Sequence, residues 1–148
     1  MKIQLRPIVK KDAKILLDWA NDISTRRNSI TKDMISEEEH LKYIQRALNS
    51  DNINVYILEV DGIPVATIKD SLYKNFTELS YNVSSFHRGK RLSVLLMDAY
   101  LYGKSGNFLC RIKNENKPSI SMVKRCGFKL DKEVNGIGYY VLKRQSLI

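Results

Sequence analysis

The stretch that decides the fold covers residues 78–96 and reads ELSYNVSSFHRGKRLSVLL. Its first part alternates strictly, with Leu79, Tyr81 and Val83 on one face and polar side chains on the other, which is the pattern of a half-buried strand. A helical pattern over about 89–103 follows almost at once. Between the two patterns the chain places a glycine among basic side chains.

This junction of strand and helix favours an anion-binding site. The first N–H groups of a helix lack partners within the helix, and they lie at the positive end of its dipole. Arg88 and Lys90 add positive charge, and Gly89 lets the main chain approach a ligand closely. The alternative is a basic surface loop followed by an ordinary helix, and the residues alone leave that alternative open.

The composition of the whole chain agrees with an attraction to anions. The chain has 148 residues, the usual size of one domain, so we expect a single domain over 1–148. It carries 25 Lys and Arg against 16 Asp and Glu, a net charge of +9. Such an excess attracts nucleic acid, acidic membranes or phosphorylated small molecules. Because the aromatic residues are not interleaved with basic ones, we do not expect nucleic acid to be the partner.

The cysteines and the N-terminus bear on the compartment. Cys110 and Cys126 lack a C-x-x-C spacing, and with two histidines in the chain they predict no metal site. We expect both to be reduced packing residues. The N-terminus lacks the apolar core of a signal peptide, and no apolar run approaches bilayer thickness. These features predict a cytoplasmic protein without membrane insertion.

The remaining patterns predict a mixed α/β sheet with helices on its faces. A helix from Ser36 is expected to bury Leu41, Ile44 and Leu48, while residues 22–35 show no clear period. The turns Asp61-Gly62 and Asn135-Gly136 predict hairpins. The expected strands are 3–8, 54–60, 64–70, 78–83, 108–113, 128–134 and 137–143, and the expected helices begin at Asp12, Ser36, about 89 and Pro118.

This order and three of its stretches resemble the GNAT superfamily of acyl-CoA-dependent N-acetyltransferases. The stretches are ELSYNVSSFHRGKRLSVLL, NENKPSISMVKRCGF and LRPIVKKDAKILLDWAND. The resemblance covers nearly the whole chain. It implies a mixed, mostly antiparallel seven-stranded sheet flanked by about four helices. It also implies an enzyme that transfers an acetyl group from acetyl-CoA to a primary amine, without a metal.

The resemblance further implies where CoA would bind. The family's phosphate loop reads Arg/Gln-x-x-Gly-x-Gly/Ala, and here Arg88 matches while Arg91 and Ser93 replace the small residues. The preceding strand is expected to bulge and to splay from its neighbour, which would expose main-chain groups to the pantetheine arm and to the thioester carbonyl. The implied cofactor residues are Asn82, Val83, Ser84, Ser85, Arg88, Gly89, Lys90, Arg91, Leu92, Ser93 and Asn116.

Two proton-transfer roles follow from the resemblance. Glu78 lies on the polar face of its strand, where it is the candidate base for the attacking ammonium, or else a carboxylate with an ordinary structural partner. Many family members protonate the leaving thiolate with a tyrosine in the last helix, but this chain has Val123 there. Tyr139 and Tyr140 are the alternatives, and alternation places only one of them on the site face.

The stretch LLDWANDISTRRNSITKDMISEEEHLKYI resembles a branch that acts on nucleotide-linked amino sugars of bacterial surface glycans, including the acetyltransferase of the pseudaminic acid pathway. That likeness implies an acceptor site whose arginines grip a diphosphate. The alternatives are that Arg26 and Arg27 lie in a solvated turn and that His40 has a structural role. A protein N-terminal or lysine acetyltransferase, a weakened CoA-binding protein and a homodimer also stay open. The implied acceptor residues are Arg26, Arg27, Asn28, Ser29 and His40.

Overall fold

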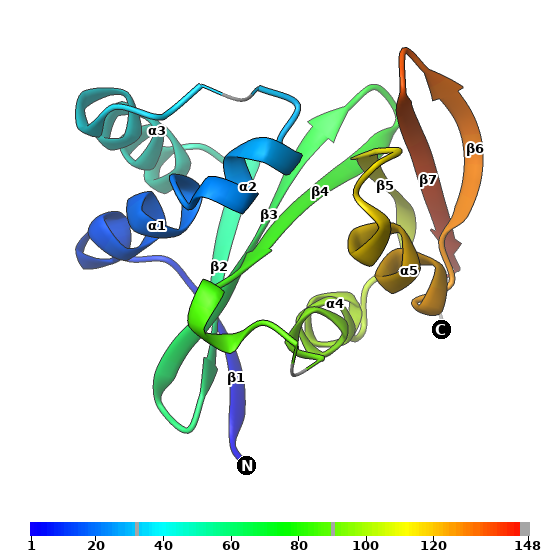
Figure 1. Cartoon of the computed structure of the whole chain (residues 1–148). Coiled ribbons are helices and arrows are strands. Elements are labelled where there is room, and N and C mark those ends of the chain that lie inside the picture. The colour runs from blue at the N-terminus through cyan, green and yellow to red at the C-terminus, as the bar shows by residue number, and fades with distance from the viewer. Residues whose placement is uncertain (32, 90, 146–148) are drawn as a thin grey trace.

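The computed structural model describes residues 1–31, 33–89 and 91–145, and it contains a seven-stranded sheet in the order β1-β2-β3-β4-β5-β7-β6 (Figure 1). The β4–β5 pair is parallel and the other pairs are antiparallel. The predicted fold class is therefore confirmed. The strands are β1 (Ile3–Pro7), β2 (Ile53–Val60), β3 (Ile63–Tyr73), β4 (Phe76–Val83), β5 (Gly106–Lys113), β6 (Lys129–Val134) and β7 (Ile137–Arg144), and the helices are α1 (Ala13–Ala20), α2 (Ile23–Asn28), α3 (Glu37–Asn49), α4 (Leu92–Leu101) and α5 (Lys117–Arg125).

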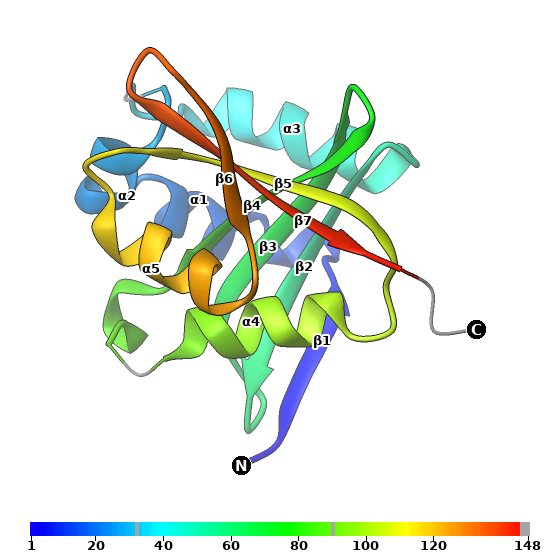
Figure 2. The same cartoon turned by 90° about the vertical axis from the view of Figure 1, so that its right-hand side faces the viewer.

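Helices cover both faces of the sheet (Figures 1 and 2). On one face, Leu16 and Trp19 of α1 and Ile44 of α3 form a buried cluster with residues of β2. On the other face, α4 and α5 pack on the larger cluster, in which Leu96 and Val123 are fully buried. Alternation along the strands explains the two clusters, because successive side chains point to opposite faces.

The parallel pair β4–β5 opens soon after it forms. Only Thr77 and Glu78 of β4 pair with β5, opposite Phe108 and Leu109. In contrast, β4 stays paired with β3 along its whole length without a register shift. The splay implied by the family resemblance is therefore present, whereas the implied bulge in β4 is not, because its ladder to β3 is regular. The two strands diverge visibly in Figure 1.

The expectations for α2, α3 and α4 differ from the structure. The segment without a clear period contains α2, whose N-cap Asp22 accepts a hydrogen bond from the Thr25 N–H. In α3, Leu41 and Leu48 are exposed, because the face toward α1 is formed by His40 and Ile44 instead.

The helix expected over 89–103 covers a shorter range in the structure. Arg91 adopts a left-handed conformation with φ of 59°, so α4 begins only at Leu92. It ends at Leu101, just before Gly103, which has a φ of 72°. Among the described residues, no helix combines the length and the apolar character that crossing a bilayer requires.

Candidate functional site

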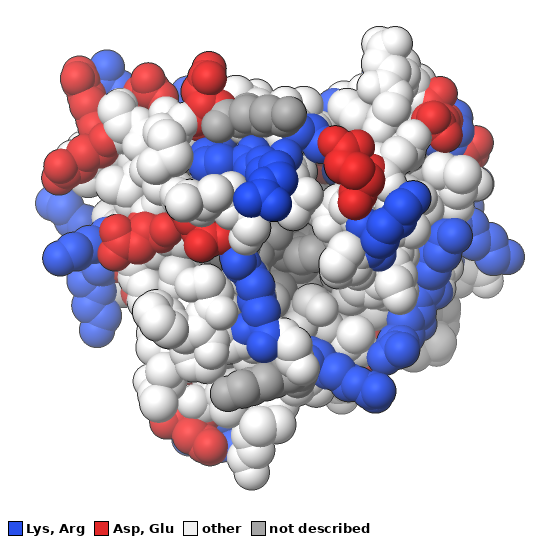
Figure 3. All heavy atoms as spheres, viewed as in Figure 1, with Lys and Arg blue, Asp and Glu red and all other residues white. Residues whose placement is uncertain are grey.

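A cavity of about 860 Å³ lies where β4 and β5 diverge. Its walls come from α2 and the segment that follows it, from β3, β4 and β5, and from the first turns of α4 and α5. Lys and Arg side chains border a hollow on the face shown in Figure 3. Because the splayed strands leave main-chain groups unpaired, this cavity offers both hydrogen-bonding edges and charge.

The start of α4 forms one end of the cavity. Gly89, Arg91, Leu92 and Ser93, which belong to the loop for which an anion site was predicted, line it. Gly89 has a φ of +81°, a conformation that favours glycine, so a side chain there would strain the loop. Lys90, which the resemblance places in the same loop, lies outside the described residues. The first N–H groups of a helix lack partners within the helix, and the first turn of α4 lines this end of the cavity.

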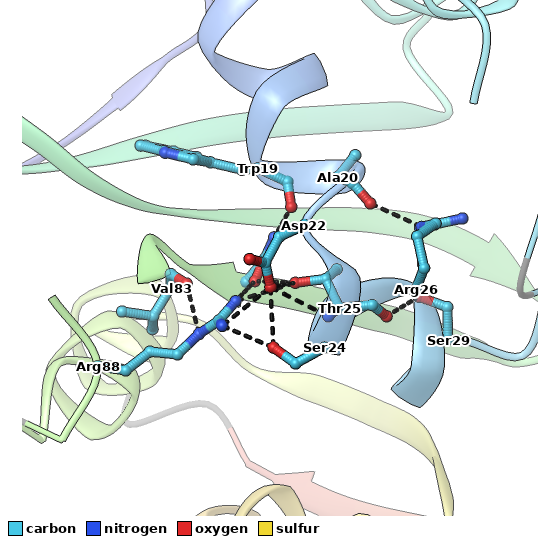
Figure 4. Close-up of polar contacts among 10 residues, drawn as sticks. Trp19, Ala20, Asp22, Ser24, Thr25, Arg26, Ser29, Val83 and Arg88 are labelled. Carbon is cyan, nitrogen blue, oxygen red and sulfur yellow. Dashed lines mark hydrogen bonds and ion pairs between the residues drawn. The ribbon is translucent and has the colours of Figure 1, made fainter. Parts of the chain in front are cut away.

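The Arg88 side chain joins the α4 loop to α2 (Figure 4). Its guanidinium donates to Asp22 Oδ2 at 2.9 Å, to Ser24 Oγ at 2.8 Å and to Thr25 Oγ1 at 2.9 Å. Burial alone would raise the pKa of Asp22, but hydrogen bonds from Ser24, Arg88 and the Thr25 N–H outweigh it and hold that pKa at about 2. Arg88 therefore lines the cavity while its charge is balanced by a carboxylate.

The end of β4 presents an open main-chain edge. The Ser84 N–H donates to Val65 O of β3 at 2.8 Å, so alternation turns the main-chain groups of Val83 away from β3. Val83 O accepts from Arg88 Nε at 3.1 Å. Asn82 and Val83 line the cavity, and the Asn82 side chain donates to Trp19 O at 2.9 Å. Ser84 and Ser85 do not line it, and Ser84 is buried.

A charged cluster occupies the cavity wall on the face of the sheet that carries α1 and α3. Both Glu78 oxygens accept from Arg111, one from Nε and the other from Nη2 at 3.0 Å. Lys69 of β3 lies beside this pair, and burial lowers the pKa of its ammonium. Glu78 was predicted from the sequence, whereas Lys69 and Arg111 were missed, because an isolated cation on a strand carries no local signal.

The two C-terminal tyrosines do not line the cavity. Tyr140 is 4% exposed and belongs to the main core, as Val123 does. Tyr139 lies on the other face of β7, where the Lys132 ammonium sits 4.8 Å from its ring centroid. The tyrosine that does line the cavity is Tyr81, whose hydroxyl forms a hydrogen bond with Ser119 Oγ of α5.

Two further polar residues line the cavity near α4 and α5. Asn116 occupies the N-cap position of α5, yet its side chain makes no capping hydrogen bond, so it is free to face a ligand. The His87 ring also lines the cavity, and its Nδ1 is buried without a hydrogen-bond partner among the described residues. Sequence reasoning missed His87. A buried polar atom without a partner is uncommon, and a bound ligand could supply one.

The structure separates the five predicted acceptor residues. Asn28 and Ser29 line the cavity, whereas Arg26, Arg27 and His40 do not. The Arg26 guanidinium donates to Ala20 O at 2.6 Å and to Thr31 O, Asp33 O and Ser29 Oγ at 3.2 Å each, so it orders its own segment. Arg27 is exposed. His40 is buried, and its Nε2 contacts Ala13 O at 2.7 Å.

In the described part of the chain, no group of three or more His, Cys, Asp or Glu side chains is arranged to hold a metal ion. Cys110 is buried in the core, and burial raises the pKa of its thiol. Such a thiol is a poor nucleophile, because the reactive form is the thiolate. The cavity lining offers a carboxylate, cations, hydroxyls and main-chain groups for chemistry.

Comparison with known proteins places the fold. No family model matches the sequence, and no curated protein matches it. Among solved structures, spermidine N-acetyltransferase from Vibrio cholerae, in complex with CoA and spermine, has a TM-score of 0.83 at 13% identity, over 96% of this chain and 95% of that chain. Aminoglycoside acetyltransferase AAC(6')-Ib, in complex with ribostamycin and CoA, has a TM-score of 0.82 at 16% identity, over 97% and 94%.

A third solved structure has a higher identity. A domain from Methanocaldococcus jannaschii matches at 23% identity with a TM-score of 0.77, over 96% of this chain and 98% of that chain. At these identities the likeness shows the fold. The chain has the fold of the GNAT N-acetyltransferases, along essentially its whole length.

Proposed function

We propose that this protein is an acetyl-CoA-dependent N-acetyltransferase that acts on the primary amine of a small molecule. One observation carries the proposal: the cavity between the splayed β4 and β5 has a helix N-terminus at one end and the Glu78 carboxylate in its wall. The chain also has the fold of two solved N-acetyltransferases that hold CoA. An anion-binding end and a proton acceptor are what the transfer of an acyl group from CoA to an amine needs.

The residues of the cavity fit CoA. Acetyl-CoA would supply the acyl group as a thioester. The first-turn N–H groups of α4, with Arg91 and the Ser93 hydroxyl, would hold its diphosphate. The open edge of β4 at Val83 would form hydrogen bonds with the amide-containing arm of CoA. The Asn116 side chain, which makes no capping hydrogen bond, would do the same. The orphaned His87 Nδ1 supports the fit, because a ligand in the cavity would complete its hydrogen bonding.

Glu78 is the residue we propose to take the proton from the attacking amine. A carboxylate has about four lone-pair positions, and Arg111 occupies two of them. The remaining positions can accept from an ammonium or from a water in the cavity. Arg111 also fixes the orientation of the carboxylate, which favours a defined geometry for proton transfer.

Tyr81 is the residue we propose to donate a proton to the departing thiolate. Tyr81 lines the cavity, and its hydroxyl contacts Ser119, another lining residue, on the first turn of α5. Burial raises the pKa of Tyr81, so the phenol stays protonated at neutral pH and remains able to donate. This role replaces the one expected for Tyr139 or Tyr140, which lie outside the cavity lining.

The acceptor we propose is a nucleotide-linked amino sugar. The solved relatives hold spermine and ribostamycin, both polyamines. Among the described residues, the cavity lining contains Lys69, Arg88, Arg91 and Arg111; Arg88 pairs with Asp22 and Arg111 with Glu78, whereas no ion pair joins Lys69 or Arg91 to a carboxylate. That charge repels a polycation and attracts an anion. The positive charge of the cavity would also repel a basic protein tail, so a protein acetyltransferase is the weaker candidate.

The test is an acetyl-transfer assay with thiol release measured for each acceptor. The panel contains UDP- and TDP-linked amino sugars, spermidine, an aminoglycoside and basic peptides, each with acetyl-CoA. We expect turnover on the nucleotide sugars and little on the polycations. Turnover on peptides but on no nucleotide sugar would contradict the acceptor assignment. CoA binding without turnover on any amine would contradict the enzymatic proposal and favour a CoA-binding protein.

A further inference from the structure

Two cations share one carboxylate in the cavity wall. Both oxygens of Glu78 accept from Arg111, and among the described residues no ion pair joins Lys69 to a carboxylate. The cluster therefore carries one excess positive charge. It lies on a half-buried surface where solvent screens charge less than it does on an open face.

Hydroxyl groups lie next to this excess charge. The sheet register places Lys69 opposite Ser80 and Ser71 opposite Glu78. Residues that lie directly opposite in an antiparallel pair point to the same face, so the four side chains share one patch of the cavity wall. Ser71 and Ser80 both line the cavity. An ammonium and two hydroxyls on one patch are a suitable set of donors for a phosphate or carboxylate oxygen.

The position of Lys69 is fixed but its charge is only partly balanced. Its ammonium lies 5.5 Å from the centroid of the Tyr43 ring on α3, a contact that orients the side chain. Burial lowers the pKa of Lys69; the charge of Glu78 acts in the opposite direction, and Arg111 lowers it further. Burying a charge costs free energy unless a counter-charge accompanies it. An anion that binds here would offset that cost.

We infer that Lys69, Ser71 and Ser80 form a subsite for an anionic group carried by the acceptor, a phosphate ester or a carboxylate. The inference rests on the proposed function, because it assigns this wall to the molecule that presents the amine. It moves the recognition of acceptor charge from Arg26 and Arg27 to β3 and β4. The guanidinium of Arg26 is already engaged with oxygens of its own segment, and Arg27 does not line the cavity.

The experiment compares three amines that share one scaffold: glucosamine, glucosamine 1-phosphate and glucosaminic acid. Values of kcat/KM are measured with acetyl-CoA, and affinities are measured by calorimetry with CoA present. We expect the wild type to prefer at least one anionic amine over glucosamine by about tenfold to a hundredfold, the range for a hydrogen bond to a charged group. Comparison of glucosamine 1-phosphate with glucosaminic acid shows whether a phosphate or a carboxylate fits the subsite.

Three variants separate recognition from structure. Lys69→Met should lower kcat/KM for the preferred anionic amine about tenfold to a hundredfold more than it lowers kcat/KM for glucosamine, and Lys69→Arg should keep most of the preference. Lys124→Met, on the exposed face of α5, removes the same charge outside the cavity and should change nothing. Melting curves check that each variant is folded.

Each outcome decides the inference. Equal use of the neutral and anionic amines by the wild type, or an equal loss for all three in Lys69→Met, would overturn the subsite while acetylation itself persists. If the wild type consumes no acetyl-CoA with any of the three amines, the panel of nucleotide sugars decides the proposed function, and the calorimetry decides the subsite alone. A binding preference for an anionic amine that Lys69→Met removes would then support it, and no preference would overturn it.

Discussion

Replacing Tyr81 by Phe keeps the ring in the core and removes the hydroxyl that contacts Ser119. If this phenol protonates the departing thiolate, kcat should fall by the amount that general acid catalysis contributes, about 10²–10⁴-fold. A thiol has an intrinsic pKa of about 8.5 and leaves tolerably well unaided. We therefore expect a loss near the lower end, about 10²-fold, with the affinity for CoA unchanged.

The effect on folding should be small by comparison. The variant loses one hydrogen bond between two partly buried groups, which is worth about 0.5–1.5 kcal/mol of unfolding free energy. Ser119→Ala is the matched control, because it removes the same hydrogen bond and leaves the phenol in place. A structural role predicts equal loss of turnover in both variants, whereas the proposed role predicts that Ser119→Ala stays active.

Single-turnover and steady-state rates with acetyl-CoA measure the effect, and an acetyl thioester with a more acidic thiol supplies a second comparison. Because that thiol needs less help to leave, the deficit of Tyr81→Phe should shrink with it. Wild-type turnover should show no loss from phenol ionisation below about pH 10, since burial raises the pKa of Tyr81 above its ordinary value of 10.0. A folded Tyr81→Phe variant with kcat within about twofold of wild type would show that the Tyr81 phenol does not protonate the thiolate.

Three further predictions concern the base, the anion site and the link between α2 and the α4 loop. Glu78→Gln should lower kcat about 10²-fold or more while the Kd for CoA holds, and retained turnover would assign the base elsewhere. Arg91→Ala should raise the Kd for CoA about tenfold or more, and calorimetry that shows no change would remove Arg91 from the diphosphate site. Asp22→Asn should destabilise the fold at neutral pH, because the folded-state pKa of Asp22 is about 2, below its ordinary value of 3.8. Asp22 therefore contributes stability above about pH 4 and loses it as the pH falls toward 2, so the melting temperatures of variant and wild type should converge there; a constant gap would contradict the assignment.

The strands and turns were predictable because their signals are local. Alternation in β4 places Leu79 on the buried face and Glu78 in the cavity wall, as the sequence predicts. The Asp61-Gly62 and Asn135-Gly136 turns have positive φ at both residues, which is the conformation that such pairs favour. These signals need no knowledge of the rest of the chain.

The errors in the helices have tertiary causes. The N-cap Asp22 of α2 also pairs with Arg88, 66 residues away in the chain, so the contact that anchors this short helix is invisible in the local pattern. In α3, spacing alone could not choose between the face with Leu41 and Leu48 and the face with His40 and Ile44. Contact with α1 decided it, through the hydrogen bond from the His40 ring to Ala13 O.

The residues of the candidate site also divide into those with a local signal in the sequence and those without one. Motif resemblance pointed to Glu78 and to the α4 loop, because both lie in one continuous stretch, and both line the cavity. Lys69 and Arg111 come from separate strands and meet only through the sheet register. Tyr81 looked like a core residue because alternation reports the face of a strand and not the reach of a long side chain. Only the packing of α5 shows that its hydroxyl ends beside Ser119.

The central claim is that this cavity transfers an acetyl group from acetyl-CoA to the amine of an anionic small molecule. The most direct measurement is mass spectrometry of UDP-linked amino sugars after incubation with acetyl-CoA and either the wild type or Glu78→Gln. We expect one added acetyl group on nitrogen with the wild type and about a hundredfold slower formation with the variant. Unmodified sugars throughout, whether or not calorimetry detects binding of CoA, would show that the cavity does not carry out this transfer.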